Sequence, residues 1–287
     1  SSSRNILARK EDAGNMNTRS SIARLIEFYD SVAQLYDQFF TELSPFYREH
    51  YLSLKKIVDG VLKYVPKGSL VVDLGCGTGF WSNYLMGKGY VVVGLDISPR
   101  SVYVLSSRGL EGIVSDARLA PFRRGAFELA VSLGSVINHI EELEMFFKSV
   151  NRILKMGGYF VFDFDNASSL DNLYETLIFN NSPWGYLSSL MSGFGKGYKF
   201  YWDLGGYYIK VHSLREVLRA SKMSGFKVVS IKPIHTFTAL MPSRISERGG
   251  KLTTKIFNAL HRLESIGSLF PLSYILSVST AVILKKI

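Results

Sequence analysis

Hydrophobic and polar positions follow two periods along the chain. From Ile22 apolar residues recur every three or four positions, and the same spacing returns after Pro45, so both segments are predicted helices. From Ser69 onward short apolar runs alternate with helical patterns. The expected strands are 69–74, 90–97, 111–117, 127–134, 159–166, 226–234 and 274–285, and the helices among them are 80–89, 98–109, 141–158 and 213–225. This alternation predicts an α/β fold with a doubly wound, mostly parallel sheet of seven strands.

Two segments fall outside the alternation. The first, about 167–211, is rich in aromatic residues and glycine. The second, about 241–272, joins the last two strands without an ordinary crossover, which predicts that the last strand is antiparallel. Residues 1–20 are polar and aperiodic, so we expect a flexible tail followed by a single domain over 21–287.

Composition limits the class of protein. The chain has 287 residues, 47% of them hydrophobic, which is ample for a core. Its single cysteine, Cys76, excludes an internal disulfide and is typical of a reducing compartment. The first residues lack a signal-peptide pattern, and the apolar run 270–284 is too short and too interrupted to span a membrane. We therefore expect a cytoplasmic protein.

The net charge of +10 is concentrated near the two ends. Residues 1–24 hold five Lys or Arg against two acids, and residues 243–287 hold seven against two. A basic surface fits an anionic partner, either nucleic acid or lipid, although solubility alone is the simpler explanation. The second insert is basic and amphipathic, which predicts either a peripheral contact with an anionic membrane or a cover for the sheet edge. We rank nucleic acid below a small-molecule or lipid-like partner.

The stretch VVDLGCGTGF (71–80) places three glycines directly after the first expected strand. Ligands bind there in open α/β sheets, and glycine lets the backbone approach them closely. The spacing is G-x-G-x-G, whereas a dinucleotide fingerprint needs a third glycine where Phe80 stands. Asp73 would repel a pyrophosphate but suits a positively charged ligand. Asp96, which ends the second strand, can accept hydrogen bonds from both hydroxyls of a ribose.

Six motifs in register resemble the class I S-adenosylmethionine-dependent methyltransferases, in particular their generic small-molecule or quinone type. They are VVDLGCGTGF, VVVGLDIS, VSDARLAPF, VNRILKMGGYFVFD, VHSLREVLRASKMSGFKVV and YDSVAQLYDQFF, and they lie between about residues 25 and 235. The resemblance implies a Rossmann-like methyltransferase fold, S-adenosyl-L-methionine as cofactor, an aromatic insert that forms a substrate lid, and an N-terminal helix that closes over the cofactor. The cofactor contacts that it implies are Tyr36, Asp73, Gly75, Cys76, Gly77, Asp96, Ile97, Asp116, Ala117 and Leu133.

Methyl transfer from this cofactor asks little of the protein. The sulfonium already carries an activated methyl group, so the enzyme has to align the reactants and exclude water. A general base is needed only for an acceptor that arrives protonated. Asn138 and His139, just beyond the fourth strand, are the catalytic candidates; a structural role is the alternative for His139, and His212 is a further open position. No metal site is predicted.

The acceptor is less well defined. Enzymes that methylate nucleobases often carry an N/D-P-P-Y/F segment after the fourth strand or use a catalytic cysteine. This chain has no such segment there and no second cysteine. The aromatic insert fits a small, hydrophobic or aromatic, lipid-like acceptor, although its rings can equally pack a core of their own. Methylation of RNA or protein through the basic ends is the alternative function. A non-catalytic binder or a dehydrogenase on the same sheet is the third, and the oligomeric state is not predicted.

Overall fold

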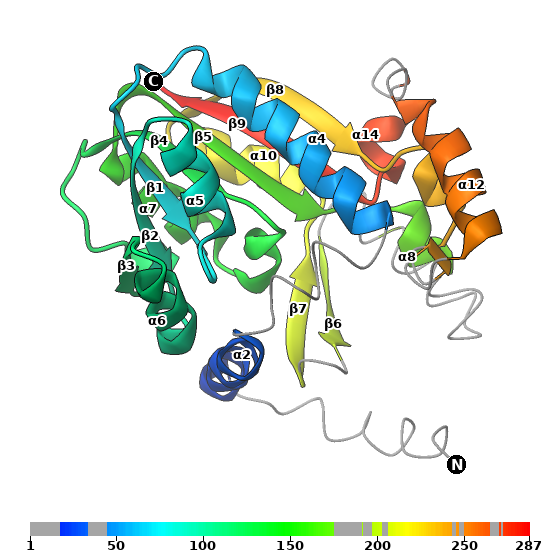
Figure 1. Cartoon of the computed structure of the whole chain (residues 1–287), viewed down its shortest axis with the longest axis horizontal. Coiled ribbons are helices and arrows are strands. Elements are labelled where there is room, and N and C mark those ends of the chain that lie inside the picture. The colour runs from blue at the N-terminus through cyan, green and yellow to red at the C-terminus, as the bar shows by residue number, and fades with distance from the viewer. Residues whose placement is uncertain are drawn as a thin grey trace.

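The computed structural model describes residues 18–33, 45–174, 191, 197–202, 206–242, 245–246, 250–264, 270 and 272–287. Figure 1 shows one twisted sheet with helices on both faces, and helix α2 (Thr18–Val32) below helix α6 (Pro99–Ser107). Helix α2 begins inside the segment that the sequence predicted as a tail. Residues 1–17 and the predicted cofactor contact Tyr36 lie outside the described residues.

The central sheet has seven strands in the order β3-β2-β1-β4-β5-β9-β8. They are β1 (Leu70–Leu74), β2 (Val91–Asp96), β3 (Glu111–Val114), β4 (Phe127–Ser132), β5 (Leu154–Asp165), β8 (Phe226–Ile234) and β9 (Ser279–Lys286). Strands β1 to β5 pair in parallel, and β9 runs antiparallel to both of its neighbours, β5 and β8. The predicted mostly parallel sheet with an antiparallel last strand is confirmed.

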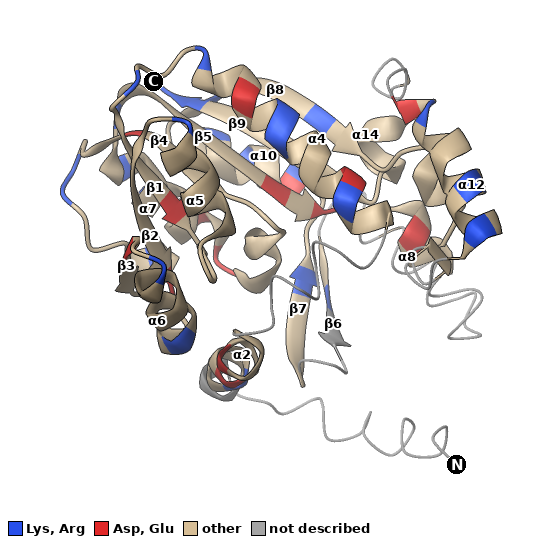
Figure 2. Cartoon of the chain, in the orientation of Figure 1, with Lys and Arg blue, Asp and Glu red and all other residues tan. Residues whose placement is uncertain are grey.

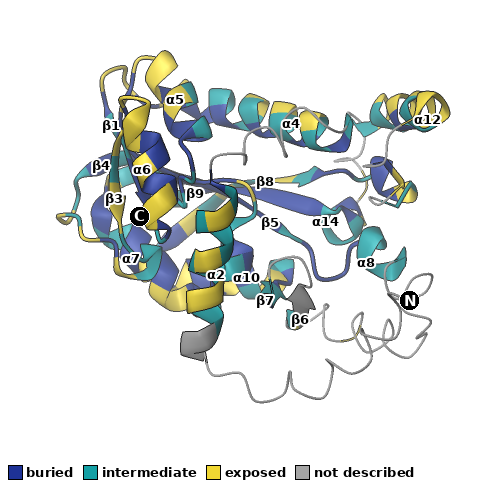
Figure 3. Cartoon of the chain, turned by 60° about the horizontal axis from the view of Figure 1, so that its bottom comes forward, coloured by how far each residue is buried: buried dark blue, intermediate teal, exposed yellow. Residues whose placement is uncertain are grey.

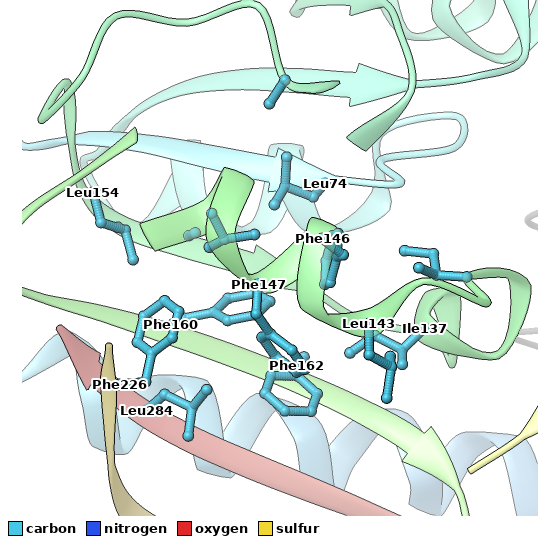
Figure 4. Close-up of a cluster of buried hydrophobic side chains, with 14 of the residues drawn as sticks. Leu74, Ile137, Leu143, Phe146, Phe147, Leu154, Phe160, Phe162, Phe226 and Leu284 are labelled. Atoms are coloured by element: carbon cyan, nitrogen blue, oxygen red, sulfur yellow. The ribbon is translucent and has the colours of Figure 1, made fainter. Parts of the chain in front are cut away.

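Helices cover both faces of this sheet. Helices α4 (Pro45–Leu62) and α5 (Phe80–Gly87) pack on one face, and α7 (Leu143–Ile153) and α10 (Leu214–Met223) pack on the other. Neighbouring residues of β5 divide between the faces: Phe160 and Phe162 belong to the α7 side, and Val161 belongs to the α4 side. Figure 4 shows the aromatic centre of the α7 side, where the rings of Phe147 and Phe162 lie 5.4 Å apart. Two buried faces explain why the strands read as continuous apolar runs.

The junction between α7 and β5 differs from the prediction. The sequence predicts one helix over 141–158, but α7 ends at Ile153 and Leu154 already pairs with Phe127 of β4. The register then shifts, so that Tyr159 is the next paired residue. Gly158 has no room for a side chain, since a Cβ would lie 3.0 Å from the carbonyl oxygen of Glu128. The two glycines therefore form a bulge inside the strand instead of ending the helix.

The aromatic insert contains a hairpin that the sequence pattern did not predict. Strands β6 (Tyr198–Trp202) and β7 (Tyr207–Val211) form a separate two-stranded antiparallel sheet. The ring of Tyr207 packs edge-on against Phe28 of α2, with 6.0 Å between the centroids. Trp184, Tyr186 and Phe194 of the insert lie outside the described residues. The substrate lid stays a prediction.

The C-terminal third adds short helices beside the sheet. They are α8 (Leu170–Tyr174), the 3₁₀ turn η5 (Thr238–Leu240), α12 (Lys251–His261) and α14 (Ser273–Leu276). The last strand begins at Ser279, not at 274 as predicted, because its partner Asp165 is already the end of β5. Within the described ranges, no helix is long and apolar enough to cross a membrane.

Candidate cofactor-binding site

A cavity lies where the carboxyl ends of β1, β2 and β4 meet. The volume within which the centre of a water molecule can move is about 130 Å³. A single buried water needs roughly 10–15 Å³ of such volume. The cavity therefore has room for a ligand of many atoms. The predicted cofactor contacts that line it are Gly75, Cys76, Gly77, Asp96, Ile97, Asp116, Ala117 and Leu133.

The glycine loop bends tightly at this end of β1. Gly75 has φ +75°, and a Cβ there would lie 2.5 Å from a methyl carbon of Val136 in the turn after β4. The N–H groups of Gly75 and Cys76 both donate to the carbonyl of Leu95 in β2 (2.7 and 3.1 Å). Gly77 also has a positive φ, +51°, and open space where a Cβ would be. Glycine is therefore required at 75 by both conformation and space.

Asp96 ties the glycine loop to the end of β2. Its Oδ2 accepts from the N–H of Gly77 (2.8 Å), and its Oδ1 accepts from the N–H of Ser98 (2.9 Å). Burial raises the pKa of this carboxyl, while the backbone donors favour its charged form. Each oxygen keeps a lone pair, so the carboxylate can still accept from ligand hydroxyls.

Asp73 lies behind the loop and does not line the cavity. Ser82 of α5 donates to its Oδ2 (2.7 Å), while its buried Oδ1 has no partner among the described residues. Burial, and then the charge of Asp96, raises the pKa of Asp73 to about 7. Trp81, which does line the cavity, has a buried indole N–H that is likewise unpaired within the described chain. The unpaired donor thus belongs to a residue of the cavity wall, and the unpaired acceptor belongs to a residue behind the glycine loop.

Asp116 is held in place by Arg118, two residues further along the chain. Arg118 donates from Nε and Nη2 to the two oxygens of Asp116 (3.1 and 2.6 Å), and its N–H donates to Oδ1 (2.8 Å). These hydrogen bonds raise the pKa of Arg118 above its usual value. Both residues line the cavity, so the carboxylate is fixed in orientation where a ligand amino group could donate to it.

Cys76 contributes its backbone to the site. Its side chain is buried, and its Sγ donates only to the neighbouring carbonyl of Gly77 (3.6 Å). Burial, followed by the charges of Asp73 and Asp96, raises the pKa of the thiol. The thiol is therefore protonated at neutral pH and is not an activated nucleophile.

Helix α2 forms part of the cavity wall through Ile22, Leu25 and Tyr29. Polar contacts hold the helix in place. Asp30 accepts from the hydroxyl of Ser98 (2.5 Å) and from the N–H of Arg100 (3.0 Å), so an acid of α2 caps the N-terminus of α6. An acid at this end of a helix is stabilised by the helix dipole.

His139 lies on the 3₁₀ turn η3 (Val136–His139) and lines the main cavity as well as a smaller one beside it. Its Nε2 lies 3.0 Å from the hydroxyl of Tyr29. Its Nδ1 is buried and has no partner among the described residues. Burial lowers the pKa of the imidazole to about 4, so the ring is neutral at physiological pH. The structure therefore places this predicted residue at the site, in its basic form.

Asn138 lines the smaller cavity but not the main one, and it lies in a cluster of buried polar groups. Its amide donates to Asp165 (2.6 Å), and its oxygen accepts from the N–H of the same residue (3.2 Å). Ser135 donates to Asp165 (2.9 Å), and Asp163 pairs with His50 of α4 (3.2 Å). Burial raises the pKa of Asp165 to about 6, against the hydrogen bond from Ser135. These contacts position η3, and they leave Asn138 no contact with the main cavity.

His212 supports the same turn from the other side. Its Nε2 donates to the carbonyls of Ile137 and Ile140 (3.2 and 3.0 Å), which flank His139. Glu216 accepts from Lys210 (2.6 Å) and lies 3.5 Å from Nδ1 of His212. Burial alone would raise the pKa of Glu216, but these hydrogen bonds lower it to about 2. His212 is thus buried behind the turn, outside both cavities.

The residues that line the cavity without having been predicted include Tyr29, Trp81, Arg118, Val136 and Ile140. Tyr29 and Trp81 were visible only as apolar positions of helices, a pattern that equally indicates core. Among the described residues, no group of three or more His, Cys, Asp or Glu side chains is placed to hold a metal ion.

Residues 72–162 match the family described as the methyltransferase domain. An uncharacterized protein of Methanocaldococcus jannaschii is 28% identical over 158 residues, 54% of this chain and 57% of that protein. A tRNA (carboxymethyluridine(34)-5-O)-methyltransferase of Xenopus tropicalis is 39% identical over 101 residues, 34% of this chain and 15% of that enzyme. An 18S rRNA (guanine(1575)-N(7))-methyltransferase of Saccharomyces cerevisiae is 32% identical over 124 residues, 38% of this chain and 45% of that enzyme. In these matches the chain spans little more than half, or less, of each curated relative.

Solved structures share the fold. An S-adenosylmethionine-dependent methyltransferase of Mesorhizobium loti superposes with a TM-score of 0.50 at 16% identity, over 79% of this chain and 96% of that one. The geranyl diphosphate C-methyltransferase of Streptomyces coelicolor A3(2) superposes with a TM-score of 0.52 at 17% identity, over 81% of this chain and 78% of that one. The [4+2]-cyclase SpnF superposes with a TM-score of 0.55 at 15% identity, over 91% of this chain and 94% of that one. Likeness at these identities concerns the fold alone.

The fit of the site to S-adenosylmethionine rests on three observations of the structure. Asp96 and Asp116 present fixed carboxylates to the cavity, suited to ribose hydroxyls and an adenine amino group. The unpaired N–H of Trp81, which lines the cavity, can donate to a carboxylate, and the buried carboxyl of Asp73 behind the loop favours a positive charge nearby. The residues matched by the family include the whole glycine loop, both carboxylates and η3. Residues 72–162 of the chain thus carry a methyltransferase domain, and the fold and the site fit S-adenosylmethionine as its cofactor.

Proposed function

We propose that this protein transfers the methyl group of S-adenosylmethionine to a small, hydrophobic or aromatic, lipid-like acceptor. The observation that carries the acceptor class is the composition of the cavity wall beyond the glycine loop. Ile22 and Leu25 of α2, together with Val136 and Ile140 beside His139, supply apolar side chains there. Apolar walls with few polar groups are typical of sites for small apolar ligands.

The chain's own residues hold and orient the reactants. When bound, the cofactor supplies a methyl group on a positively charged sulfur. Asp96 would accept from the ribose and Asp116 would accept from the adenine, while Asp73, behind the loop, would supply negative charge that favours an ammonium group in the cavity. Helix α2, which forms part of the cavity wall, would limit the access of water, which matters because a transferable methyl group can otherwise be lost to solvent.

His139 is proposed as the group that touches the acceptor. In the tautomer whose Nε2–H donates to the hydroxyl of Tyr29, Nδ1 of the neutral imidazole is free to accept a proton or a hydrogen bond. Its lowered pKa makes it a weak base, which favours orientation of the acceptor over full removal of a proton. Asn138 is proposed to position η3 through Asp165.

Methylation of RNA is the second candidate, because two relatives bear the names of tRNA and rRNA methyltransferases. Those matches extend over 34% and 38% of this chain, so the acceptor-binding parts of those enzymes are not carried over. A cytoplasmic location with a peripheral membrane contact belongs to the lipid-like proposal. A dehydrogenase is disfavoured because Phe80 stands where its third glycine would be.

Labelled cofactor tests the proposal directly. The protein is incubated with S-adenosylmethionine carrying a labelled methyl group and, in parallel, with lipid, small-molecule and RNA fractions of the source cells. We expect label in the lipid or small-molecule fraction, and none when Asp96→Ala replaces the wild type. Label that appears only in RNA would reject the proposed acceptor and support the second candidate. Label in no fraction, with cofactor binding intact, would favour a binder.

A further inference from the structure

We propose that the exposed face of helix α12 and the turn after it is a docking surface for an anionic lipid membrane. This face, called the outer face here, carries two kinds of side chain. Its cations are Lys251, Lys255 and Arg262, and its apolar residues are Leu252, Ile256, Ala259 and Leu263. The large apolar side chains are strongly exposed: Leu252 to 71%, Ile256 to 45% and Leu263 to 43%.

The opposite face of α12 anchors the helix to the domain. Phe257 is fully buried, and Nε2 of His261 lies 3.1 Å from a carboxylate oxygen of Glu49 in α4. Glu264 accepts from the backbone N–H groups of residues 236–238 at 2.8–3.0 Å. Glu264 is the single acid of the stretch 250–264, so no carboxylate of this stretch lies among the exposed cations. The outer face is therefore presented in a fixed orientation.

The outer face is arranged as two parallel stripes. The cations follow each other at spacings of four and seven residues, and so do the three large apolar residues, one position further along. Residues at this spacing lie on the same side of a helix. Figure 2 shows basic residues along α12, which lies at the edge of the view, and Figure 3 shows exposed residues along the same helix. None of the three cations forms an ion pair with a described residue.

A lipid surface uses both stripes at once. Leu and Ile side chains enter the boundary between head groups and acyl chains, while the long stems of Lys and Arg let their charges reach the lipid phosphates. A nucleic acid would engage the cations and leave the apolar stripe in water. An ordinary solvated helix would carry polar residues in place of Leu252, Ile256 and Leu263. The pairing of the stripes thus favours the membrane.

Cosedimentation of the full chain with vesicles tests this surface without any need for methyl transfer. We expect binding to vesicles of phosphatidylserine with phosphatidylcholine, and little binding to phosphatidylcholine alone. The triple variant K251Q/K255Q/R262Q should bind the anionic vesicles less tightly, by about fivefold for each cation removed. The double variant L252S/I256S should lose binding comparably while keeping its net charge.

A matched control removes the same charge elsewhere. The variant K63Q/R123Q/K227Q alters exposed cations outside α12 and should bind the vesicles nearly as the wild type does. All of these side chains are exposed, so the melting temperature should stay constant across the set. Wild-type protein that fails to sediment with anionic vesicles would overturn the proposal. Vesicle binding by K251Q/K255Q/R262Q equal to that of the control variant would also overturn it. A third contrary outcome is that the wild type and L252S/I256S bind RNA equally well and neither of them binds vesicles.

Discussion

The hydroxyl of Tyr29 lies 3.0 Å from Nε2 of His139, and this contact joins helix α2 to the turn after β4. Both side chains line the main cavity, so a ligand seated there would touch both partners. The two segments are more than a hundred residues apart in the chain (|i−j| = 110). Helix α2 cannot leave the cavity wall without breaking this hydrogen bond.

Tyr29→Phe should weaken the attachment of α2. Removal of one hydrogen bond costs about 1 kcal/mol, so we expect the dissociation rate of S-adenosylmethionine to rise about fivefold. Stopped-flow fluorescence measures that rate. Tyr103→Phe on α6, where the side chain is 69% exposed, is the matched control and should leave the rate unchanged. Equal rates in both variants would show that the contact does not retain the cofactor.

His139→Ala should lower turnover by roughly 10²–10⁴ if the imidazole acts as a base, with little change in cofactor affinity. The sequence predicts an ascending limb of the pH–rate profile near the ordinary histidine pKa of about 6.5. In the structure burial lowers this pKa to about 4, so we expect the limb there instead. Turnover measured from pH 4 upward, with calorimetry of cofactor binding, distinguishes a base from a positioning group. A mutant that keeps the limb excludes the base.

The same burial makes stability depend on pH. Because the folded pKa of His139 lies below the unfolded one, its neutral form stabilises the fold above about pH 6.5, and this contribution is lost as pH falls toward about 4. His139→Gln should flatten the fall in melting temperature over that window. Thermal melts at several pH values measure it. A mutant with the wild-type slope would place the dependence elsewhere, with buried His235 as the next candidate.

Asp73→Asn should change binding and stability in opposite directions. The folded pKa of Asp73 is raised to about 7, so its contribution to stability is full below the unfolded value of about 4 and is lost as pH rises through 7. Above pH 7 the variant should therefore have a higher unfolding free energy than the wild type, by up to roughly 4 kcal/mol, and a higher melting temperature. Its cofactor affinity should be lower and nearly independent of pH. Calorimetry at pH 6 and pH 8 tests this, since wild-type affinity should rise with pH.

Asp96→Ala should weaken cofactor binding by about 1.5–3 kcal/mol, since charge-assisted hydrogen bonds are lost. The change also removes the acceptor for the N–H of Gly77, so some of the effect comes from the loop. Glu111→Ala on the exposed start of β3 is the control for a lost acid. Titration calorimetry with S-adenosylhomocysteine gives both affinities. Equal affinities would remove Asp96 from the site.

Gly75→Ala should destabilise the protein, because its Cβ would collide with Val136 and its φ is positive. Overpacking costs about 1–3 kcal/mol, and the left-handed conformation adds about 1–2 kcal/mol. The double variant G75A/V136A should recover the first part only. Urea unfolding of the four proteins in this cycle measures the coupling. Purely additive effects would show that Val136 moves aside freely.

Most helices and strands could be predicted because the signals that define them lie within a few neighbouring residues. Helix α6, predicted over 98–109, begins with Ser98, which accepts from the N–H of Ser101 (3.0 Å), and with Pro99 at its first position, two residue types common at helix starts. The glycine loop and Asp96 were likewise found from their place at strand ends, and they line the cavity. Such features need only a few neighbouring residues, which is why the pattern reveals them.

Other features depend on contacts between distant segments, and the pattern could not show them. Gly157 and Gly158 end a helix by sequence rules, but the pairing of Leu154 with β4 turns them into a bulge. Asp73 was predicted as a cofactor contact, but it lies behind the loop, where it accepts a hydrogen bond from Ser82 of α5 and does not line the cavity. The low pKa of His139 comes from burial under α2, which no local motif encodes.

Strand β9 has a consequence for how the chain is made. It lies between β5 and β8, and Lys286 donates to the carbonyl of Leu154, 132 residues earlier. During synthesis β5 has to wait with an open edge until residues 279–286 leave the ribosome, and open edges invite pairing with other chains. Closure over such distances is also slow. The nascent protein should therefore need protection from aggregation while residues 166–286 are translated, however stable the finished fold is.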